Sequence, residues 1–289
     1  MRMRTWYNMS AVAMLALLCA CSTVAPVGPP AQASGGDTWT RPADGATMVY
    51  VPAGEFPYGP GSSEDVPDRR VYLDAYWIDR TEVTNAQYAC CVADGVCLEP
   101  IYTVPYEDPA RADHPVVAIS HGEAETFCAW AGGRLPREIE WEKAARGTDG
   151  RIYPWGDAFE PQWVNHYWTA IGGTQPVGSY PEGASPYGAL DMSGNVSEWV
   201  QERWRTLEEY LENPLSTHYG GPHPVGAHFT LRGGGWPDLE TSLRTYFRTN
   251  EEPTWRTKDM GFRCVISQAV TATSAPAGPW PDGTPEVQR

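Results

Sequence analysis

The sequence predicts a single α+β domain with little regular secondary structure. Three observations point to this class. Two segments are typical of β-strands, one of them by its alternating pattern, and two others have the capping signals of short helices. Beyond Arg151 the regular patterns thin out. The chain also carries 29 Gly, 27 Pro and 13 Trp among 289 residues, so we expect many turns and loops held by large aromatic side chains.

The strand signals come first along the chain. Residues 48–52 read Met-Val-Tyr-Val-Pro and lead into a turn at Gly54. In residues 71–77, Val, Leu, Ala and Trp occupy every second position, which is the period of a half-buried strand. We therefore predict one strand in each segment.

The helix signals follow. Thr84 can cap a helix that runs through Cys91. Ser120 and Glu123 form a capping box, and the apolar face behind it ends at the glycine pair 132–133. A further helix is predicted to open at Pro136 and to close at Gly147.

The N-terminus is typical of an exported bacterial lipoprotein. Arg2 and Arg4 precede an apolar stretch, residues 10–18, which is shorter than the ~20 residues of a membrane-spanning helix. It ends in Leu-Cys-Ala-Cys, so Cys21 is the predicted lipidation site, and Ser22 after it favours the outer membrane, facing the periplasm or the surface. The alternative is an ordinary secretory signal in which Cys21 is incidental.

Composition divides the chain into four parts. We expect a signal peptide over 1–20, a flexible tether over 21–44, one domain over 45–268 and a disordered tail over 269–289, since the tether and tail are rich in Pro, Ala, Gly and Ser. A net charge of −15 argues against a nucleic-acid partner, which requires a basic surface. After export the five cysteines of the domain would tend to pair, leaving one over.

From residue 46 to residue 266 the motifs resemble the formylglycine-generating enzyme (sulfatase-modifying factor) family. The matching segments are 48–56, 77–85, 127–136, 140–147, 153–156, 191–199, 232–236 and 261–264. This resemblance implies an α+β fold related to C-type lectin domains. It also implies a copper oxidase whose metal is held by a C-x4-C thiolate pair. The interval between Trp236 and Gly261 contains no cysteine, so we predict that this protein does not make formylglycine.

The resemblance also assigns roles to other residues. It implies a disulfide between Cys128 and Cys264, and the spacing of Cys91 and Cys97 suggests a local one, with Cys90 as the odd thiol or as the alternative partner of Cys97. In Asp-x-x-Gly-Asn-x-x-Glu, two carboxylates and two carbonyls suit Ca²⁺. Here the predicted calcium ligands are Asp191, Gly194, Val196 and Glu198, against a capped turn without an ion. Asn165 and His166 would begin a weaker second site.

Two further groups are candidates for function. Trp236, Arg244 and Arg248 lie in the half of the chain that forms the family's ligand groove. His218, His223 and His228 recur at five-residue intervals in a Gly/Pro-rich loop and could gather around copper or iron, although exposed histidines are usually solvated. His114, before Pro115, is interpreted as a turn residue.

The leading hypothesis is therefore a lipid-anchored, calcium-stabilised module of the cell envelope that binds a peptide, a glycan or an envelope protein. No catalytic residue is assigned. The alternative is a metal-dependent oxidoreductase of the same family with non-cysteine ligands. A third reading is a purely structural envelope component, which predicts no concave pocket beside Trp236 and Arg248.

Overall fold

The computed structural model describes residues 28–59, 69–205, 208 and 228–268, and it confirms a single α+β domain of modest secondary-structure content. Within these residues the first sheet is antiparallel and has the order β1 (Thr38–Thr40), β2 (Thr47–Val51), β5 (Tyr76–Asp79), β10 (Val265–Ser267). A separate hairpin joins β3 (Gly54–Pro57) to β4 (Arg70–Leu73). The second sheet has the order β8 (Thr249–Glu251), β7 (Phe229–Arg232), β6 (Ser197–Arg203), β9 (Met260–Phe262), with β6 and β9 parallel.

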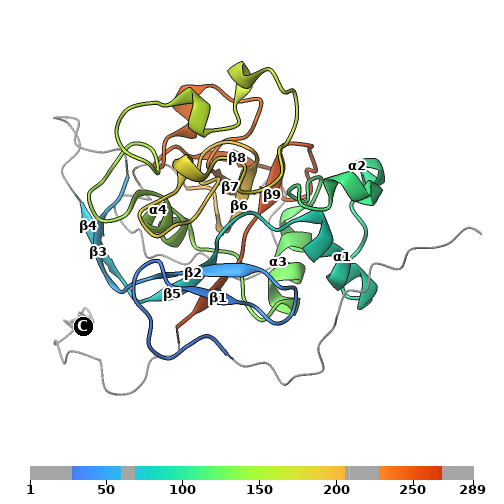
Figure 1. Cartoon of the computed structure of the whole chain (residues 1–289), viewed down its shortest axis with the longest axis horizontal. Coiled ribbons are helices and arrows are strands. Elements are labelled where there is room, and N and C mark those ends of the chain that lie inside the picture. Colours follow the sequence, from blue (N-terminus) through green and yellow to red (C-terminus); the bar gives the residue numbers. More distant parts are fainter. Residues whose placement is uncertain (1–27, 60–68, 206–207, 209–227, 269–289) are drawn as a thin grey trace, which may run out of the picture.

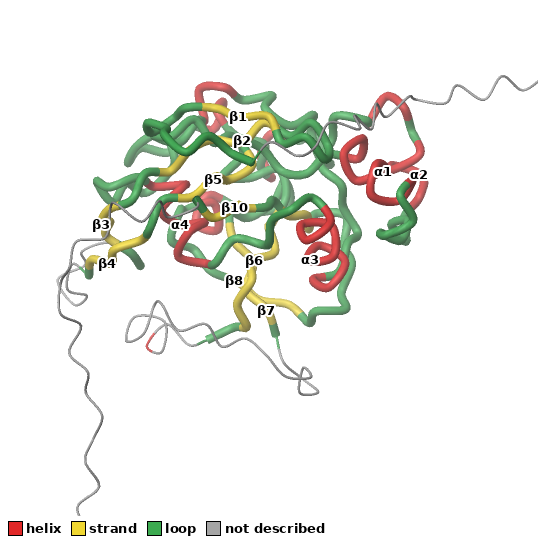
Figure 2. Tube along the Cα trace, turned by 90° about the horizontal axis from the view of Figure 1, so that it is seen from below, coloured by secondary structure: helices red, strands yellow, loops and turns green. Residues whose placement is uncertain are grey.

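The helices are short and lie around these sheets. They are α1 (Asn85–Ala93), α2 (Thr103–Glu107), α3 (His121–Trp130) and α4 (Glu138–Arg146). Single helical turns punctuate the loops, namely η1 (Pro109–Arg111), η2 (Pro161–Trp163), η3 (Tyr167–Thr169), η4 (Pro181–Gly183) and η5 (Glu240–Leu243). In both whole-chain views α1, α2 and α3 lie at one end of the molecule and the β3–β4 hairpin at the other (Figures 1 and 2).

Local signals predicted three of the α-helices, α1, α3 and α4, and two of the strand segments. The capping boxes of Thr84 with Gln87 and of Ser120 with Glu123 are both formed, at the predicted starts of α1 and α3. The helix predicted to open at Pro136 begins at Glu138 instead, because Arg137 is still extended and Glu140 reaches back to cap it. The single strand predicted over 71–77 is two strands, β4 and β5, which belong to different sheets.

The ordered domain begins earlier than the predicted boundary at residue 45. β1 lies within the segment expected to be a flexible tether, and it pairs with β2. Trp39 packs edge-on against Trp77 at 6.2 Å, and the buried Arg41 forms an ion pair with Asp79 at 2.9 Å. These long-range contacts order a stretch whose Pro- and Gly-rich composition suggested a linker.

Two cystine bridges join pairs of described residues in the domain. Cys128 in α3 is bonded to Cys264 next to β10, and Cys91 in α1 is bonded to Cys97. Both pairings are as predicted. Cys90 is disulfide-bonded as well, so the prediction of a leftover thiol there is wrong. In the parts of the chain that the structure describes, no helix has the length and apolar character needed to cross a membrane.

Candidate functional site

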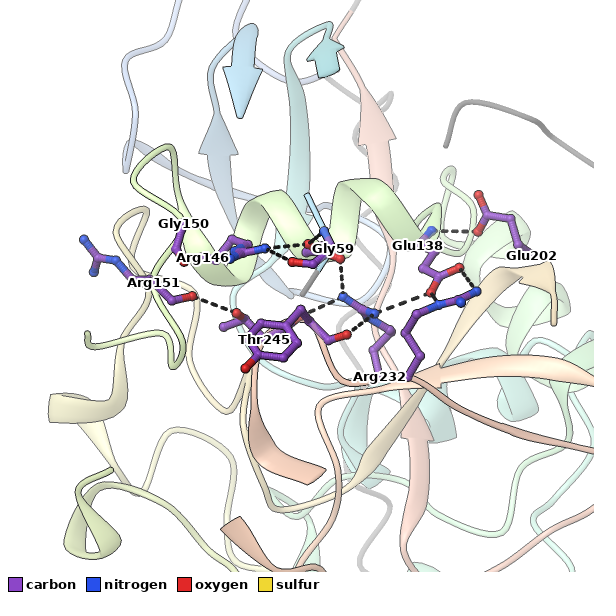
Figure 3. A network of polar contacts seen from close by, with 11 residues as sticks. Gly59, Glu138, Arg146, Gly150, Arg151, Glu202, Arg232 and Thr245 are labelled. Carbon is purple, nitrogen blue, oxygen red and sulfur yellow. Dashed lines mark hydrogen bonds and ion pairs between the residues drawn. The ribbon is translucent and has the colours of Figure 1, made fainter. Parts of the chain in front are cut away.

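A buried network of ion pairs fills the space beneath α4. Arg232 in β7 donates to Glu142 at 2.7 Å and to the Thr245 carbonyl at 2.7 Å, and it lies 3.4 Å from Glu138 (Figure 3). Arg146 completes the network on the other side, pairing with Glu142 at 2.9 Å. All four charged side chains are essentially inaccessible to solvent. These charged side chains therefore neutralise one another, and we assign them a structural role.

The predicted groove residues do not share one surface. Arg248 belongs to the buried network, because its guanidinium pairs with Glu138 and lies 4.7 Å from the ring centre of Trp204. Arg244 is only partly exposed and hydrogen-bonds the Tyr153 hydroxyl. Trp236 alone of the three lines a described cavity. In this structure Arg248 is held in the interior by the buried charge of Glu138, so the groove role of these residues stays a prediction.

The interval between Trp236 and Gly261 is occupied by hydroxyl and charged groups where the family carries thiolates. Thr245 is fully buried, donates its hydroxyl to the Arg151 carbonyl at 2.9 Å, and accepts Arg232 on its own carbonyl (Figure 3). Its oxygen atoms are thus already hydrogen-bonded. Neutral hydroxyls are poor ligands for Cu(I), which prefers soft thiolates.

The predicted calcium segment lies on the turn that precedes β6. Gly194 has φ +78°, and a Cβ at this position would approach the Asn165 carbonyl to 2.3 Å, so only glycine fits the turn. Glu198 is fully buried, and both of its oxygens accept from Arg263 at 2.6 Å, while one also accepts from Trp141 at 2.8 Å. In this conformation the Glu198 carboxylate is saturated by donors from the protein.

A second buried carboxylate, Glu82, lies beside Asp191. Asp191 accepts from the Gly178 amide at 2.6 Å and is hydrogen-bonded to the Glu82 side chain. Burial, followed by the charge of Asp191, raises the pKa of Glu82 well above its usual range. One Glu82 oxygen finds no donor among the described residues. The Glu82–Asp191 pair therefore needs either a shared proton or a cation.

The weaker second calcium site has a different arrangement. The Asn165 side-chain oxygen and the His166 carbonyl both accept the Thr169 hydroxyl, at 3.1 and 2.6 Å. That hydroxyl thus occupies the point on which the two oxygens converge. A second cation at Asn165 and His166 therefore stays a prediction, and it would have to displace the Thr169 hydroxyl.

The histidine loop is only partly described. His218 and His223 lie outside the described residues, so their convergence with His228 stays a prediction. Among the residues that are described, no cluster of three or more His, Cys, Asp or Glu side chains could hold a metal ion.

A groove runs along the exposed side of α2. A cavity of about 300 Å³ is lined by residues that include Arg111, His114, Trp236 and Lys258. It continues into a shallower cavity of about 670 Å³ that runs between residues 101–105 and residues 256–259. The two cavities share Val104, Pro105, Val117 and Lys258, so they form one continuous depression, which we call the α2 groove.

Sequence reasoning missed three polar residues of this groove. His114 was interpreted as a turn residue, but its Nδ1 lies 2.9 Å from the Thr174 hydroxyl, and its pKa is lowered by burial and by the nearby Arg111. Arg111 and Lys258 carried no motif. The one signal that could have identified them is that their charges lack a carboxylate partner in a strongly acidic chain. Ion pairing cannot be read from the sequence, because it depends on the tertiary structure.

Comparisons with known proteins agree with this architecture. A family model described as the sulfatase-modifying factor enzyme 1-like domain matches residues 36–268. The formylglycine-generating enzyme of Streptomyces coelicolor is 30% identical over an alignment of 317 positions, gaps included, that covers 87% of this chain and 99% of that protein. The solved structure of PvdO from Pseudomonas aeruginosa covers 82% of this chain and is itself covered completely, with a TM-score of 0.64 at 24% identity, which shows the fold.

A further relative is much longer than the shared region. Serine/threonine-protein kinase Pkn1 of Chlamydia trachomatis is 32% identical over an alignment of 237 positions, gaps included, that covers 75% of this chain but 38% of the kinase. The chain therefore spans less than two fifths of that relative. A family model over most of the chain and a relative matched almost end to end lead to one conclusion: this chain belongs to the sulfatase-modifying factor enzyme 1-like family.

Proposed function

We propose that this protein is a lipid-anchored binding module of the bacterial envelope that uses the α2 groove and does not make formylglycine. Its ligand would be a peptide, a glycan or an envelope protein. The fold supports binding, because the groove is open and lies beside Trp236, whereas the polar groups beneath α4 are paired with one another.

The single observation that carries the proposal is the missing thiolate pair. No cysteine lies between Trp236 and Gly261. In addition, the described cysteines 90, 91, 97, 128 and 264 are all in disulfides, so none of them offers a thiolate to copper.

Calcium belongs to the proposal as a stabilising ion. The supporting observation is the buried Glu82–Asp191 pair, which lies near the predicted turn and lacks a full set of donors. A cation held by Asp191 and the carbonyls of Gly194 and Val196 would neutralise this pair. Binding by Glu198 would additionally require its carboxylate to leave Arg263.

The lipid anchor and the envelope location are proposals that rest on the N-terminal sequence. Cys21 and the preceding apolar stretch lie outside the described residues. Metabolic labelling with a clickable fatty acid, comparing the wild-type protein with Cys21→Ala, tests the anchor directly. Labelling of the Cys21→Ala variant at the wild-type level would contradict it.

The first experiment is to purify the mature domain from the periplasm without chelators or metal-affinity tags. Its metal content is then measured, and a cysteine-containing peptide is incubated with it and analysed for an aldehyde product. We expect calcium, no stoichiometric copper or iron, and no aldehyde. Aldehyde formation would refute the proposal.

The alternative, a metal-dependent oxidoreductase, makes a different prediction in the same experiment. It requires stoichiometric copper or iron that is lost on His218→Ala or His223→Ala. If the purified protein contains no calcium, the proposed binding role stands, but the proposed stabilisation by calcium is refuted.

A further inference from the structure

The α2 groove contains two cations without carboxylate partners. Arg111 and Lys258 make no ion pair with any described residue, although the chain has a net charge of −15. Lys258 instead lies 5.2 Å from the ring centre of Trp236. The third cation at the groove, Arg256, is occupied by Glu123 through two hydrogen bonds of 2.9 Å. Arg111 and Lys258 therefore remain available to an anionic ligand.

The other part of the groove is apolar and exposed. Ile101, Tyr102 and Val104 leave 57%, 52% and 80% of their surface in water. They stand next to each other along the edge of the larger cavity. Soluble proteins seldom cluster large apolar side chains in this way unless the surface contacts a ligand or partner.

We propose that the α2 groove binds an extended peptide segment in which apolar residues flank an Asp or Glu. The acidic side chain would lie between Arg111 and Lys258, and the apolar side chains would cover Ile101 and Val104. This assignment rests on the proposed binding function and specifies its ligand. Asp108 and Asp259 also line the two cavities, and Asp108 caps a helical turn by accepting the Ala110 amide at 3.0 Å. A carboxylate ligand complements the two cations Arg111 and Lys258, and an extended chain can span both cavities.

The geometry favours a peptide over a glycan. Sugars bind proteins largely by stacking on exposed aromatic faces, and the Lys258 ammonium already lies over the Trp236 ring, 5.2 Å from its centre. In addition, the apolar rim is formed by aliphatic side chains at Ile101 and Val104 as well as by Tyr102.

The test uses the mature domain and three fluorescein-labelled peptides of alternating Leu and Ser. The peptides differ only in a central residue, which is Glu, Gln or Lys. Fluorescence polarisation should show binding of the Glu peptide, affinity for the Gln peptide weaker by about tenfold, and no measurable binding of the Lys peptide. Binding of the Glu peptide should weaken as salt is raised.

Variants on the groove locate the site. Arg111→Ala and Lys258→Ala should each weaken the Glu peptide by about fivefold to tenfold and leave the Gln peptide unchanged. Val104→Asp should weaken both peptides. Arg70→Ala is the matched control, because Arg70 is an exposed arginine on β4, at the opposite end of the molecule from α2 (Figure 1). Far-ultraviolet circular dichroism confirms that each variant is folded.

The outcomes separate the two proposals. Equal affinity for the Glu and Gln peptides, or no effect of Arg111→Ala, overturns the acidic-peptide assignment and leaves the binding module standing. Binding to an immobilised glycan panel, without binding of any peptide, likewise overturns the acidic-peptide assignment and leaves the binding module standing. Aldehyde production from a cysteine peptide overturns the binding-module proposal itself.

Discussion

The arginines beneath α4 and the arginine at the α2 groove have opposite surroundings. Arg232 and Arg146 lie beneath α4, without solvent access, and each is held by a glutamate. Arg111, on the edge of the α2 groove, is half-exposed and has no carboxylate partner among the described residues. A buried, paired charge cannot be given up to a ligand without leaving its partner unpaired in the interior.

This difference in burial and pairing distinguishes arginines that stabilise the fold from an arginine that is available to bind a ligand. Charges that are saturated by the protein itself hold β7 and α4 together. Charges that face water without a partner are the ones that can recognise a ligand. Three predictions test this contrast, starting with the largest expected effect.

Removing a charge from the buried network should be severely destabilising. Arg232→Leu leaves Glu138 and Glu142 close together in the interior with less compensation. We expect the free energy of unfolding, measured by urea denaturation, to fall by about 3–5 kcal/mol. Arg70→Leu, at an exposed position on β4, should change it by less than about 0.5 kcal/mol. A similar small change for both variants would contradict the scaffold role.

Glu202 should make stability depend on pH. Its carboxylate accepts from the Glu138 amide at 2.6 Å, and burial, reinforced by the charge of Glu138, raises its pKa to about 8 from 4.5. Between these values the folded protein keeps a proton that the unfolded chain has released. The free energy of unfolding should therefore fall as pH rises through this range.

We expect a decrease on the order of 2 kcal/mol between pH 5 and pH 7 that is due to Glu202. Glu202→Gln keeps an acceptor for the Glu138 amide and removes the titrating group. Urea denaturation at several pH values should give a shallower decline for this variant. Parallel curves for the two proteins would show that Glu202 titrates normally.

Changes in the groove should have the smallest effect on stability. Arg111→Ala and Lys258→Ala remove partly or fully exposed side chains that make no ion pair with a described residue. We expect the free energy of unfolding to change by less than about 0.5 kcal/mol, even though binding of the acidic peptide weakens. A loss of more than about 2 kcal/mol in the free energy of unfolding would show that these residues stabilise the fold, as the buried arginines do, and would contradict the contrast between the two groups.

Local sequence signals predicted much of the fold. The capping boxes at Thr84 and Ser120 depend on residues three positions apart, so the sequence contains the complete motif. The boundary at residue 45 failed because β1 is ordered by Trp77 and Asp79, which lie far along the chain. The break between β4 and β5 was missed for a similar reason, since the two strands join different sheets.

The candidate site was less predictable than the fold. The absence of cysteine between Trp236 and Gly261 and the glycine at 194 can be read directly from the sequence. The grouping of Trp236, Arg244 and Arg248 could not be tested in that way, because burial depends on the partners that each arginine finds.

By itself the sequence determined the family motifs, the missing thiolate pair and the local caps, since each of these is a property of neighbouring residues. The tertiary structure alone decided which charges are neutralised. Arg232 meets Glu138 across 94 residues of chain, and the α2 groove assembles residues from Asn85 to Asp259. Arginines that look alike in sequence thus differ in role, because the free energy of a charge depends on its solvent and its neighbours in space.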